Sequence, residues 1–330
     1  MVRARSLERP IVVVAGPTAC GKSALALRLA QELQGEIFNL DSVQIYRGLD
    51  IGSAKLAPGE RAGIAHHLLD IADPSQEFNV FEYCRAAEAA LQATAAQPVF
   101  AGGSTMYLTS LLHGIAELPA RDPELRASLE GQSSEELQQL LRAKDPEAAA
   151  RLHLNDRVRV IRALETVLLS GLKLSELHQQ HGYREIKRAA LIIVPFWERA
   201  LLYQRIEQRS AKMVESGLIE ETKDLISQFG PSAPALRSLG YHQALKFLQG
   251  QIALTQLVPE IALFTRRYAK RQTTFWRNEP GKRGWQISAV NAPEKLSPEQ
   301  LLQRIHAALA QGVTQTMVWL VDPHALFLDT

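Results

Sequence analysis

The sequence predicts an α/β protein: a parallel sheet core of the P-loop, nucleoside triphosphate hydrolase-like type that carries an all-helical insertion domain. Three observations predict this fold class. A β-branched run, 11–15, ends at Gly16 and precedes a stretch of helical periodicity, 23–33. Short apolar runs at 36–40, 98–101 and 189–194 alternate with helical segments, as in parallel sheets. From residue 119, about 70 residues contain helix-start signals and no convincing strand.

The helices are predicted from their start and stop signals. Ser133 and Glu136 form the pattern of a capping box, and Asp145 precedes a first-turn proline. Gly171 ends an amphipathic segment that begins at residue 157. Further helices are expected over 81–96, over most of 197–278 and over 296–311, with a loop at 280–284.

These signals divide the chain into four parts. We expect a first part of the P-loop core over residues 1–118 and the helical insertion over 119–188. The second part of the core, with C-terminal helices, is expected over 189–311. The apolar tail, 312–330, has no role that its sequence suggests.

The composition is that of an ordinary globular protein. Of 330 residues, 46% are apolar and 22% are charged, which excludes disordered, collagen-like and fibrous classes. Two cysteines, Cys20 and Cys84, can form neither a disulfide framework nor a four-cysteine zinc site. No apolar run approaches the length of a membrane span. We therefore expect a cytoplasmic protein with no membrane segment, and the net charge of +2 does not by itself predict a nucleic-acid partner.

A phosphate-binding loop follows the first predicted strand. Residues 16–23 fit G-x-x-x-x-G-K-[ST] between a strand and a helix. In such a loop, backbone N–H groups and the helix N-terminus face an anion; Lys22 reaches the phosphates and Ser23 offers its hydroxyl to Mg²⁺. The motif therefore predicts a diphosphate or triphosphate ligand without fixing the reaction. No Asn-Lys-x-Asp motif of a GTPase is present, whereas a kinase stays open.

A second candidate site begins at Asp41, where the second predicted strand ends. Open α/β sheets bind ligands at the carboxyl ends of their strands, so we expect Asp41 to face the phosphate loop. Asp41 could be a Mg²⁺ ligand or a general base, and spacing does not separate these roles.

The motifs together resemble the tRNA dimethylallyltransferase family, also called tRNA isopentenyltransferases. The resemblance is collinear over about residues 11–285. It is carried by the segments 16–23, 41–55, His66 to Asp70, Gly102–Gly103, Asn155–Asp156, 205–209, Gly240–Tyr241 and 270–277.

The resemblance implies a prenyl transfer. The phosphate loop, Gly16, Pro17, Thr18, Ala19, Cys20, Gly21, Lys22 and Ser23, would hold the diphosphate of dimethylallyl diphosphate with the help of Mg²⁺. The acceptor would be the exocyclic amine of the adenosine 3′ of the anticodon, tRNA position 37, and the products N6-dimethylallyladenosine and diphosphate. An adenine amine is a poor nucleophile, so the reaction needs a base, orientation and neutralisation of the leaving diphosphate.

The resemblance also assigns roles to single residues. Asp41 matches the general base, and Lys22, Ser23 and Arg209 match the set that stabilises the diphosphate. Arg205 is one helical turn before Arg209 and shares its face. The family pattern Gly-Gly-Thr is replaced here by Gly102-Gly103-Ser104, so that Ser104, or else Thr105, would supply the hydroxyl near the amine.

A basic, aromatic segment near the C-terminal end is suited to RNA. Between residues 266 and 283 there are seven Lys and Arg residues against one acid, Glu279, with Tyr268, Phe275 and Trp276 among them. The alternative is a solvated helix face over core aromatics. In the family, four stretches and Arg126 contact tRNA; here they correspond to Asp41, Ser42, Val43, Gln44, Val158, Arg159, Val160, Ile161, Arg162, Arg237, Ser238, Leu239, Gly240, Tyr241, His242, Lys270, Arg271, Gln272, Thr273, Thr274, Phe275, Trp276 and Arg277.

The expected partner is therefore the anticodon stem-loop of tRNA, clamped by the helical insertion against the core, and the protein is expected to be a monomer. Two alternatives stay open: a P-loop small-molecule kinase, which leaves the basic segment without a role, and an adenylate isopentenyltransferase that acts on free AMP or ADP. A non-catalytic RNA-binding module has no use for Asp41 beside a phosphate loop. Paired His66 and His67 are expected to hydrogen-bond locally rather than bind a metal.

Overall fold

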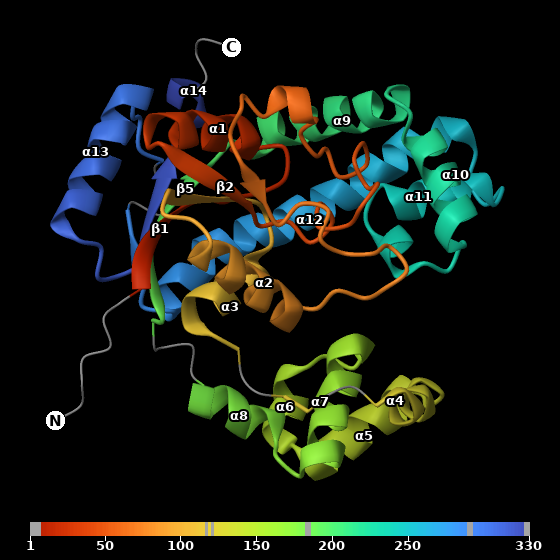
Figure 1. Cartoon of the computed structure of the whole chain (residues 1–330). Helices are drawn as coiled ribbons and strands as arrows, with labels where there is room; N and C mark the ends of the chain where they lie inside the picture. The colour runs from red at the N-terminus through yellow and green to blue at the C-terminus, as the bar shows by residue number, and fades with distance from the viewer. Residues whose placement is uncertain (1–7, 116–117, 120–121, 182–185, 289–292, 327–330) are drawn as a thin grey trace, which may run out of the picture. The chain divides into compact units, whose positions relative to one another are not determined.

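The computed structural model describes residues 8–115, 118–119, 122–181, 186–288 and 293–326. Clustering of the chain gives two compact units: residues 1–112 with 186–330, and residues 113–185. The first unit is an α/β domain and the second is helical (Figure 1). The helical unit begins six residues before the expected boundary at 119 and ends before β5, which starts at Arg188.

The α/β unit is built on a seven-stranded sheet in the order β3-β2-β4-β1-β5-β7-β6, and every neighbouring pair is parallel. Residues 11–14 of β1 are fully buried, as expected for a strand covered on both faces. The strands are β1 (Glu8–Val14), β2 (Gly35–Asn39), β3 (His66–His67), β4 (Gln97–Ala101), β5 (Arg188–Pro195), β6 (Gln286–Ile287) and β7 (Met317–Val321).

Helices cover both faces of this sheet (Figure 1). Side chains of α1 and α13 pack on one face, and those of α2, α3 and α12 pack on the other. A further cluster joins α10 and α11 to the loop that follows β2. The helices of this unit are α1 (Lys22–Glu32), α2 (Val80–Gln92), α3 (Thr105–His113), α9 (Arg199–Glu215), α10 (Leu218–Phe229), α11 (Tyr241–Leu248), α12 (Leu254–Lys282), α13 (Pro298–Gln311) and α14 (Pro323–Leu326), with short 3₁₀ turns at Pro58–Glu60 and Pro234–Arg237.

The helical unit has its own apolar core, which includes Leu137, Leu141, Val160, Ile161 and Leu164. Its helices are α4 (Pro123–Glu130), α5 (Ser134–Lys144), α6 (Pro146–Arg151), α7 (Arg157–Ser170) and α8 (Leu174–His181). The predicted capping box at the start of α5 and the aspartate cap of α6 are both present. Asp156 precedes α7 without a capping bond from its side chain, and Gly171 ends that helix in the left-handed conformation.

The structure gives the apolar tail a place that the sequence left open, and one expectation about the C-terminal part is wrong. In the tail, β7 lies between β5 and β6, and Val318 to Val321 are buried. The sequence of a short apolar run does not show which strands it pairs with, so its position is known only from the sheet. The predicted loop at 280–284 begins too early, because α12 continues to Lys282 with Pro280 buried in its last turn. Residues 327–330 of the tail lie outside the described part.

In the described part of the chain, no helix has both the length and the apolar character that crossing a bilayer would require.

Trp319 tests the place of the tail in the core. Its side chain is 2% exposed and lies under the guanidinium of Arg304, 4.5 Å from the ring centre. Trp319→Ala should lower the free energy of unfolding by about 3–5 kcal/mol, since a large buried side chain is deleted. Urea unfolding measures this change, and Phe81→Ala, at a residue 64% exposed, is the control. Equal, small losses in both variants would contradict a core position for β7.

Candidate active site

The phosphate loop leaves the carboxyl end of β1 and leads into α1, whose N-cap is Gly21. Lys22 Nζ donates to the carbonyl oxygen of Pro17 at 2.8 Å and therefore reaches back across the loop. Thr18, Ala19, Gly21, Lys22 and Ser23 line a cavity of about 410 Å³. The side chain of Cys20 is buried, and burial raises the pKa of its thiol.

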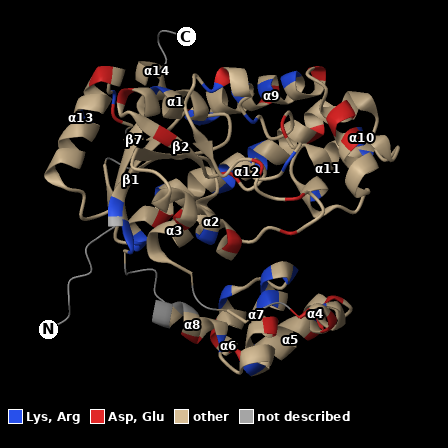
Figure 2. Ribbon diagram, viewed as in Figure 1, with Lys and Arg blue, Asp and Glu red and all other residues tan. Residues whose placement is uncertain are grey.

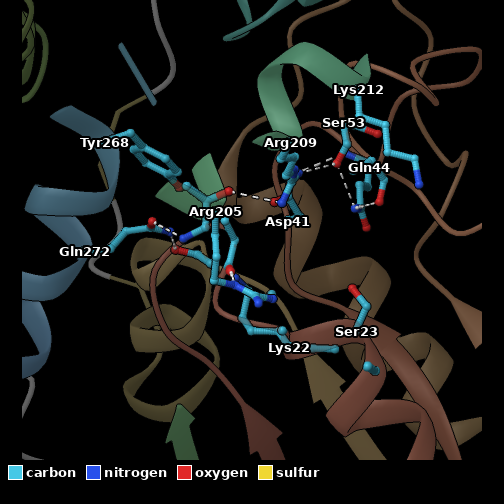
Figure 3. A pocket seen from close by; sticks show the side chains of 18 of the residues that line it. Lys22, Ser23, Asp41, Gln44, Ser53, Arg205, Arg209, Lys212, Tyr268 and Gln272 are labelled. Atoms are coloured by element: carbon cyan, nitrogen blue, oxygen red, sulfur yellow. Dashed lines mark hydrogen bonds between the residues drawn. The ribbon is translucent and has the colours of Figure 1, made fainter. Parts of the chain in front are cut away.

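Asp41 lines the same cavity from the loop after β2 (Figure 3). Its Oδ1 accepts hydrogen bonds from the backbone N–H groups of Val43 at 2.8 Å and Gln44 at 3.4 Å. Buried Asn39 fixes the preceding backbone, because its amide donates to the carbonyl oxygen of Asp41 and accepts from the Asp41 N–H. The carboxylate is thus oriented by one oxygen, and none of the described residues bonds to the other.

Arg209 and Arg205 reach the phosphate loop from the same side of α9. Arg209 Nη1 donates to Thr18 Oγ1 at 3.3 Å and Nη2 donates to the carbonyl oxygen of Ser53 at 3.4 Å. Burial lowers the pKa of the Arg209 guanidinium, and the Asp41 carboxylate opposes that shift. Arg205 Nε donates to the carbonyl oxygen of Ala19 at 2.9 Å and its guanidinium stacks on Trp197. Two cations therefore face the loop that already presents backbone N–H groups.

The loop that joins Asp41 to Lys55 is held in place by Glu221 of α10. The carboxylate accepts backbone N–H groups of Asp50, Ile51 and Gly52 at 2.8–3.2 Å. It also accepts the hydroxyl of Tyr241 at 2.5 Å. A Cβ at Gly52 would lie 2.5 Å from the Tyr241 ring, so the residue must be glycine for the loop to approach α11.

Gln208, together with Tyr268, Gln272 and Lys212, completes the cavity. The last three are labelled in Figure 3. Sequence reasoning did not place Tyr268, Gln208 or Lys212 in the site. Burial and the Asp41 carboxylate raise the pKa of the Tyr268 hydroxyl. Helical spacing could have found two of them: Tyr268 is four residues before Gln272, and Lys212 is three after Arg209.

Ser104 does not line this cavity. It is 8% exposed, and its hydroxyl accepts the N–H of Tyr107 at 3.4 Å at the start of α3. Gly102 and Gly103 do line the cavity. The structure thus brings Asp41 and Arg209 together but leaves the hydroxyl of Ser104 engaged by its own helix.

Several residues expected to contact RNA are buried instead. Gln272 and Trp276 of α12 and Tyr241 of α11 are at most 4% exposed. Val160 and Ile161 lie in the core of the helical unit. Each of these residues lies on a helix, and a helix of a globular protein turns one face toward the core. Their burial argues against side-chain contact with RNA, and the assignment itself stays a prediction. Phe275 is partly buried against the same core as Trp276, and Gly240 is buried.

The remaining residues of these stretches keep access to solvent. Lys270, Arg271 and Arg277 are exposed, and they form no ion pair within the described residues. Glu279, the one acidic residue of this segment, pairs instead with Lys282 and Arg283. Basic residues recur along α9 and α12 (Figure 2). Ser42, Val158, Arg159, Arg237, His242 and Thr274 are exposed, and Val43, Gln44, Arg126, Arg162, Ser238, Leu239 and Thr273 are partly buried. Arg126 and Arg162 pair with buried Glu165.

The paired histidines hydrogen-bond locally, as expected. His67 Nε2 lies 2.7 Å from the Glu36 carboxylate, and His66 Nδ1 lies 2.9 Å from the Ile64 carbonyl oxygen. The contact with His67 lowers the pKa of the Glu36 carboxyl. Burial lowers the pKa of the His66 imidazole. Among the described residues, no group of three or more His, Cys, Asp or Glu could hold a metal ion.

A parallel sheet with a phosphate loop, two cations and an aspartate at its carboxyl edge defines a P-loop-fold protein that acts on a diphosphate or triphosphate. The IPP transferase family model matches residues 44–279, and an isopentenyl transferase model matches residues 10–74. The chain belongs to the tRNA dimethylallyltransferase (IPP transferase) family, a family of prenyltransferases.

Individual relatives are similar over most of the chain. A tRNA dimethylallyltransferase of Anaeromyxobacter dehalogenans is 44% identical over 89% of this chain and 98% of its own length. A tRNA dimethylallyltransferase 1 of Pelobacter propionicus is 41% identical over 87% of this chain and 94% of its own length.

Solved structures agree with this fold. The tRNA isopentenylpyrophosphate transferase of Bacillus halodurans is 31% identical, with a TM-score of 0.63 over 92% of this chain and 96% of that one. A eukaryotic dimethylallyltransferase acting on tRNA has a TM-score of 0.77 over 98% of this chain and 86% of that one. At 24% identity, the second comparison shows the fold alone.

A variant of Tyr241 tests whether this side chain stabilises the core or contacts RNA. Tyr241→Phe removes the hydroxyl that Glu221 accepts, so the free energy of unfolding should fall by about 1–3 kcal/mol. Binding of an anticodon stem-loop RNA should not change, because Tyr241 is fully buried. Chemical unfolding and an RNA titration measure the two effects, with His242→Ala, at an exposed neighbour, as the comparison. Weaker RNA binding at unchanged stability would restore the assignment from the resemblance.

Proposed function

We propose that this enzyme transfers the dimethylallyl group of dimethylallyl diphosphate to the N6 amine of the adenosine 3′ of the anticodon, at tRNA position 37. The products are N6-dimethylallyladenosine and diphosphate. The observation that carries the proposal is a cavity that the phosphate loop, Asp41 and Arg209 line together. It places an anion site for the leaving group beside a carboxylate that can accept a proton.

Asp41 acts as the general base on the adenine amine. Hydrogen bonds from Val43 and Gln44 hold Oδ1, and Oδ2, to which none of the described residues bonds, is the oxygen that would accept the proton. A bond forms between N6 and the allylic carbon, the carbon–oxygen bond to diphosphate breaks, and Asp41 takes one amine proton. A positioned base contributes about 10²- to 10⁴-fold to such a reaction.

The diphosphate is bound by the loop N–H groups, Lys22 and Arg209. Charge grows on the leaving diphosphate in the transition state, and fixed donors stabilise it there more than in the ground state. Arg209 is partly buried, and a guanidinium keeps its charge in such a place and binds phosphate oxygens in pairs. Its contact with Thr18 Oγ1 already points it at the loop.

A Mg²⁺ ion fits this donor set. Mg²⁺ binds through one or two protein oxygens plus substrate phosphates rather than in an all-protein cage. The hydroxyl of exposed Ser23 and the carboxylate of Asp41 line the same cavity, and the described residues contain no larger cluster of metal-binding side chains. Ser23 would hold the ion, which supplies neutralising charge to the diphosphate.

The exposed cations of α12, Lys270, Arg271 and Arg277, supply the RNA-binding surface on the α/β unit. Exposed Arg159 of α7 supplies a second surface on the helical unit. Because phosphate contacts release counterions, binding should weaken as salt rises. The enzyme works as a monomer in the cytoplasm, and light scattering of the purified protein tests the monomeric state.

A transfer assay tests the function. The protein is incubated with labelled dimethylallyl diphosphate, Mg²⁺ and unmodified tRNA, and the nucleosides are separated. We expect label in N6-dimethylallyladenosine, and loss of transfer when a chelator removes Mg²⁺. Parallel reactions with AMP and with ATP are the controls. Label in AMP alone would contradict tRNA as the acceptor, and phosphorylation without prenyl transfer would contradict the proposed reaction.

Asp41→Asn tests the general base, since the amide keeps the size and the hydrogen bond to Val43 but is a far weaker base. Turnover should fall by roughly 10²- to 10⁴-fold while RNA binding is retained. Asp73→Asn is the control, because Asp73 lies in a neighbouring loop and pairs with Arg47 outside the cavity. Single-turnover rates and an RNA titration measure the two effects, and unchanged turnover would exclude Asp41 as the base.

A further inference from the structure

Gln272 connects two loops of the site that lie far apart in the sequence. Its Oε1 accepts the backbone N–H of Thr18 in the phosphate loop at 2.9 Å. Its Nε2 donates to the carbonyl oxygen of Gly103, at the end of β4, at 2.8 Å. The side chain is 4% exposed and lines the cavity that holds Asp41 and Arg209 (Figure 3).

The two bonds fix the orientation of the Gln272 amide. A backbone N–H can only donate and a carbonyl oxygen can only accept, so the amide oxygen must face Thr18 and the nitrogen must face Gly103. Among side chains of this length that carry no ionisable group, only glutamine offers one acceptor and one donor in that arrangement. The end of β4 is adapted to it, because a Cβ at Gly103 would lie 2.3 Å from Gln272 Nε2.

We propose that Gln272 is a positioning residue that keeps the phosphate loop at a fixed distance from the Gly102–Gly103 turn, and that it does not contact RNA. The proposal deepens the proposed prenyl transfer and rests on it for its kinetic consequences. The phosphate loop, which would hold the donor, and the Gly102–Gly103 turn both line the cavity. The amide therefore fixes the spacing between two segments that line the site.

The place of Gln272 on α12 adds a link to RNA binding. The two residues before it, Lys270 and Arg271, are exposed and form no ion pair with any described residue, whereas the Gln272 side chain is buried. One helix thus carries an RNA-facing side and the amide that holds the donor loop.

Gln272→Met tests the proposal, because it keeps the length and volume but removes both hydrogen bonds. We expect weaker binding of inorganic diphosphate by about tenfold, and a fall in turnover of roughly 10- to 100-fold, since small displacements of reacting groups have such effects. The affinity for an anticodon stem-loop RNA and its salt dependence should not change. Calorimetry, single-turnover kinetics and an RNA titration at several salt concentrations measure these quantities.

Two variants serve as controls. Lys270→Met should do the opposite: it should weaken RNA binding and flatten its salt dependence while diphosphate binding is unchanged. Gln303→Met removes an exposed glutamine from α13, far from the site, and should change none of these quantities. Thermal unfolding of all three variants reports whether the fold is intact.

Gln272→Glu gives a signature that loss of packing alone does not produce. A protonated carboxyl has a carbonyl acceptor and an O–H donor and so replaces the amide, whereas a carboxylate faces the Gly103 carbonyl oxygen with a charge and no proton. Burial raises the pKa of such a group. The ratio of variant to wild-type turnover should therefore increase as the pH falls from 8 to 5.5, and the ratio of diphosphate affinities should follow it.

The outcomes separate this proposal from the proposed function. If Gln272→Met weakens RNA binding and leaves diphosphate binding intact, Gln272 is an RNA contact and the proposal is overturned. If neither changes, the two hydrogen bonds do not hold the site and it is also overturned. Diphosphate binding requires no prenyl transfer, so a wild-type protein that fails to modify tRNA would overturn the function while this measurement still decides the role of Gln272.

Discussion

The backbone of the phosphate loop is held by side chains that come from the other end of the chain, and the site depends on these bonds. Trp197 Nε1 donates to the carbonyl oxygen of Cys20, and Arg205 donates to that of Ala19. Gln272 accepts the N–H of Thr18. These partners lie 177 to 254 residues away. A buried loop without such partners would leave polar backbone groups unsatisfied, so α9 and α12 must dock before the loop can have its shape.

The orientation of the Asp41 carboxylate has the same dependence on distant partners. It follows β2 directly, but its orientation requires Asn39 below it and the loop from residue 41 to 55 beside it. That loop is held by Glu221, which satisfies three consecutive backbone N–H groups and the hydroxyl of Tyr241. The Glu221 carboxylate of α10 therefore fixes the loop that begins at Asp41, as Gln272 fixes the phosphate loop.

The α12 helix shows why residue types alone do not separate the side chains of a surface from those of the core. Lys270, Arg271 and Arg277 are exposed and uncompensated, whereas Gln272 and Trp276, which are four residues apart, lie on the buried side. A stretch that reads as basic and aromatic thus combines an outer face with a core face, and aromatic residues at helical spacing favour the core. The alternative interpretation, a solvated helix face over core aromatics, correctly describes Trp276. The exposed cations of α12 still favour RNA as a partner.

The sequence by itself determined the parts of this protein that local patterns encode. The glycines and Lys22 of the phosphate loop form a motif that lies within eight consecutive residues, so its identity as an anion site is readable without its distant partners. Asp41 follows a strand that a short apolar run predicts. Helix caps such as Ser133 with Glu136 lie within one turn, so they too were visible. Tertiary structure decided what depends on distant neighbours: β7 joins the sheet only through β5 and β6. It also showed that the Ser104 hydroxyl accepts the N–H of Tyr107 at the start of α3. Gln272 became a part of the site through two bonds to backbone atoms, and backbone atoms leave no mark in a sequence.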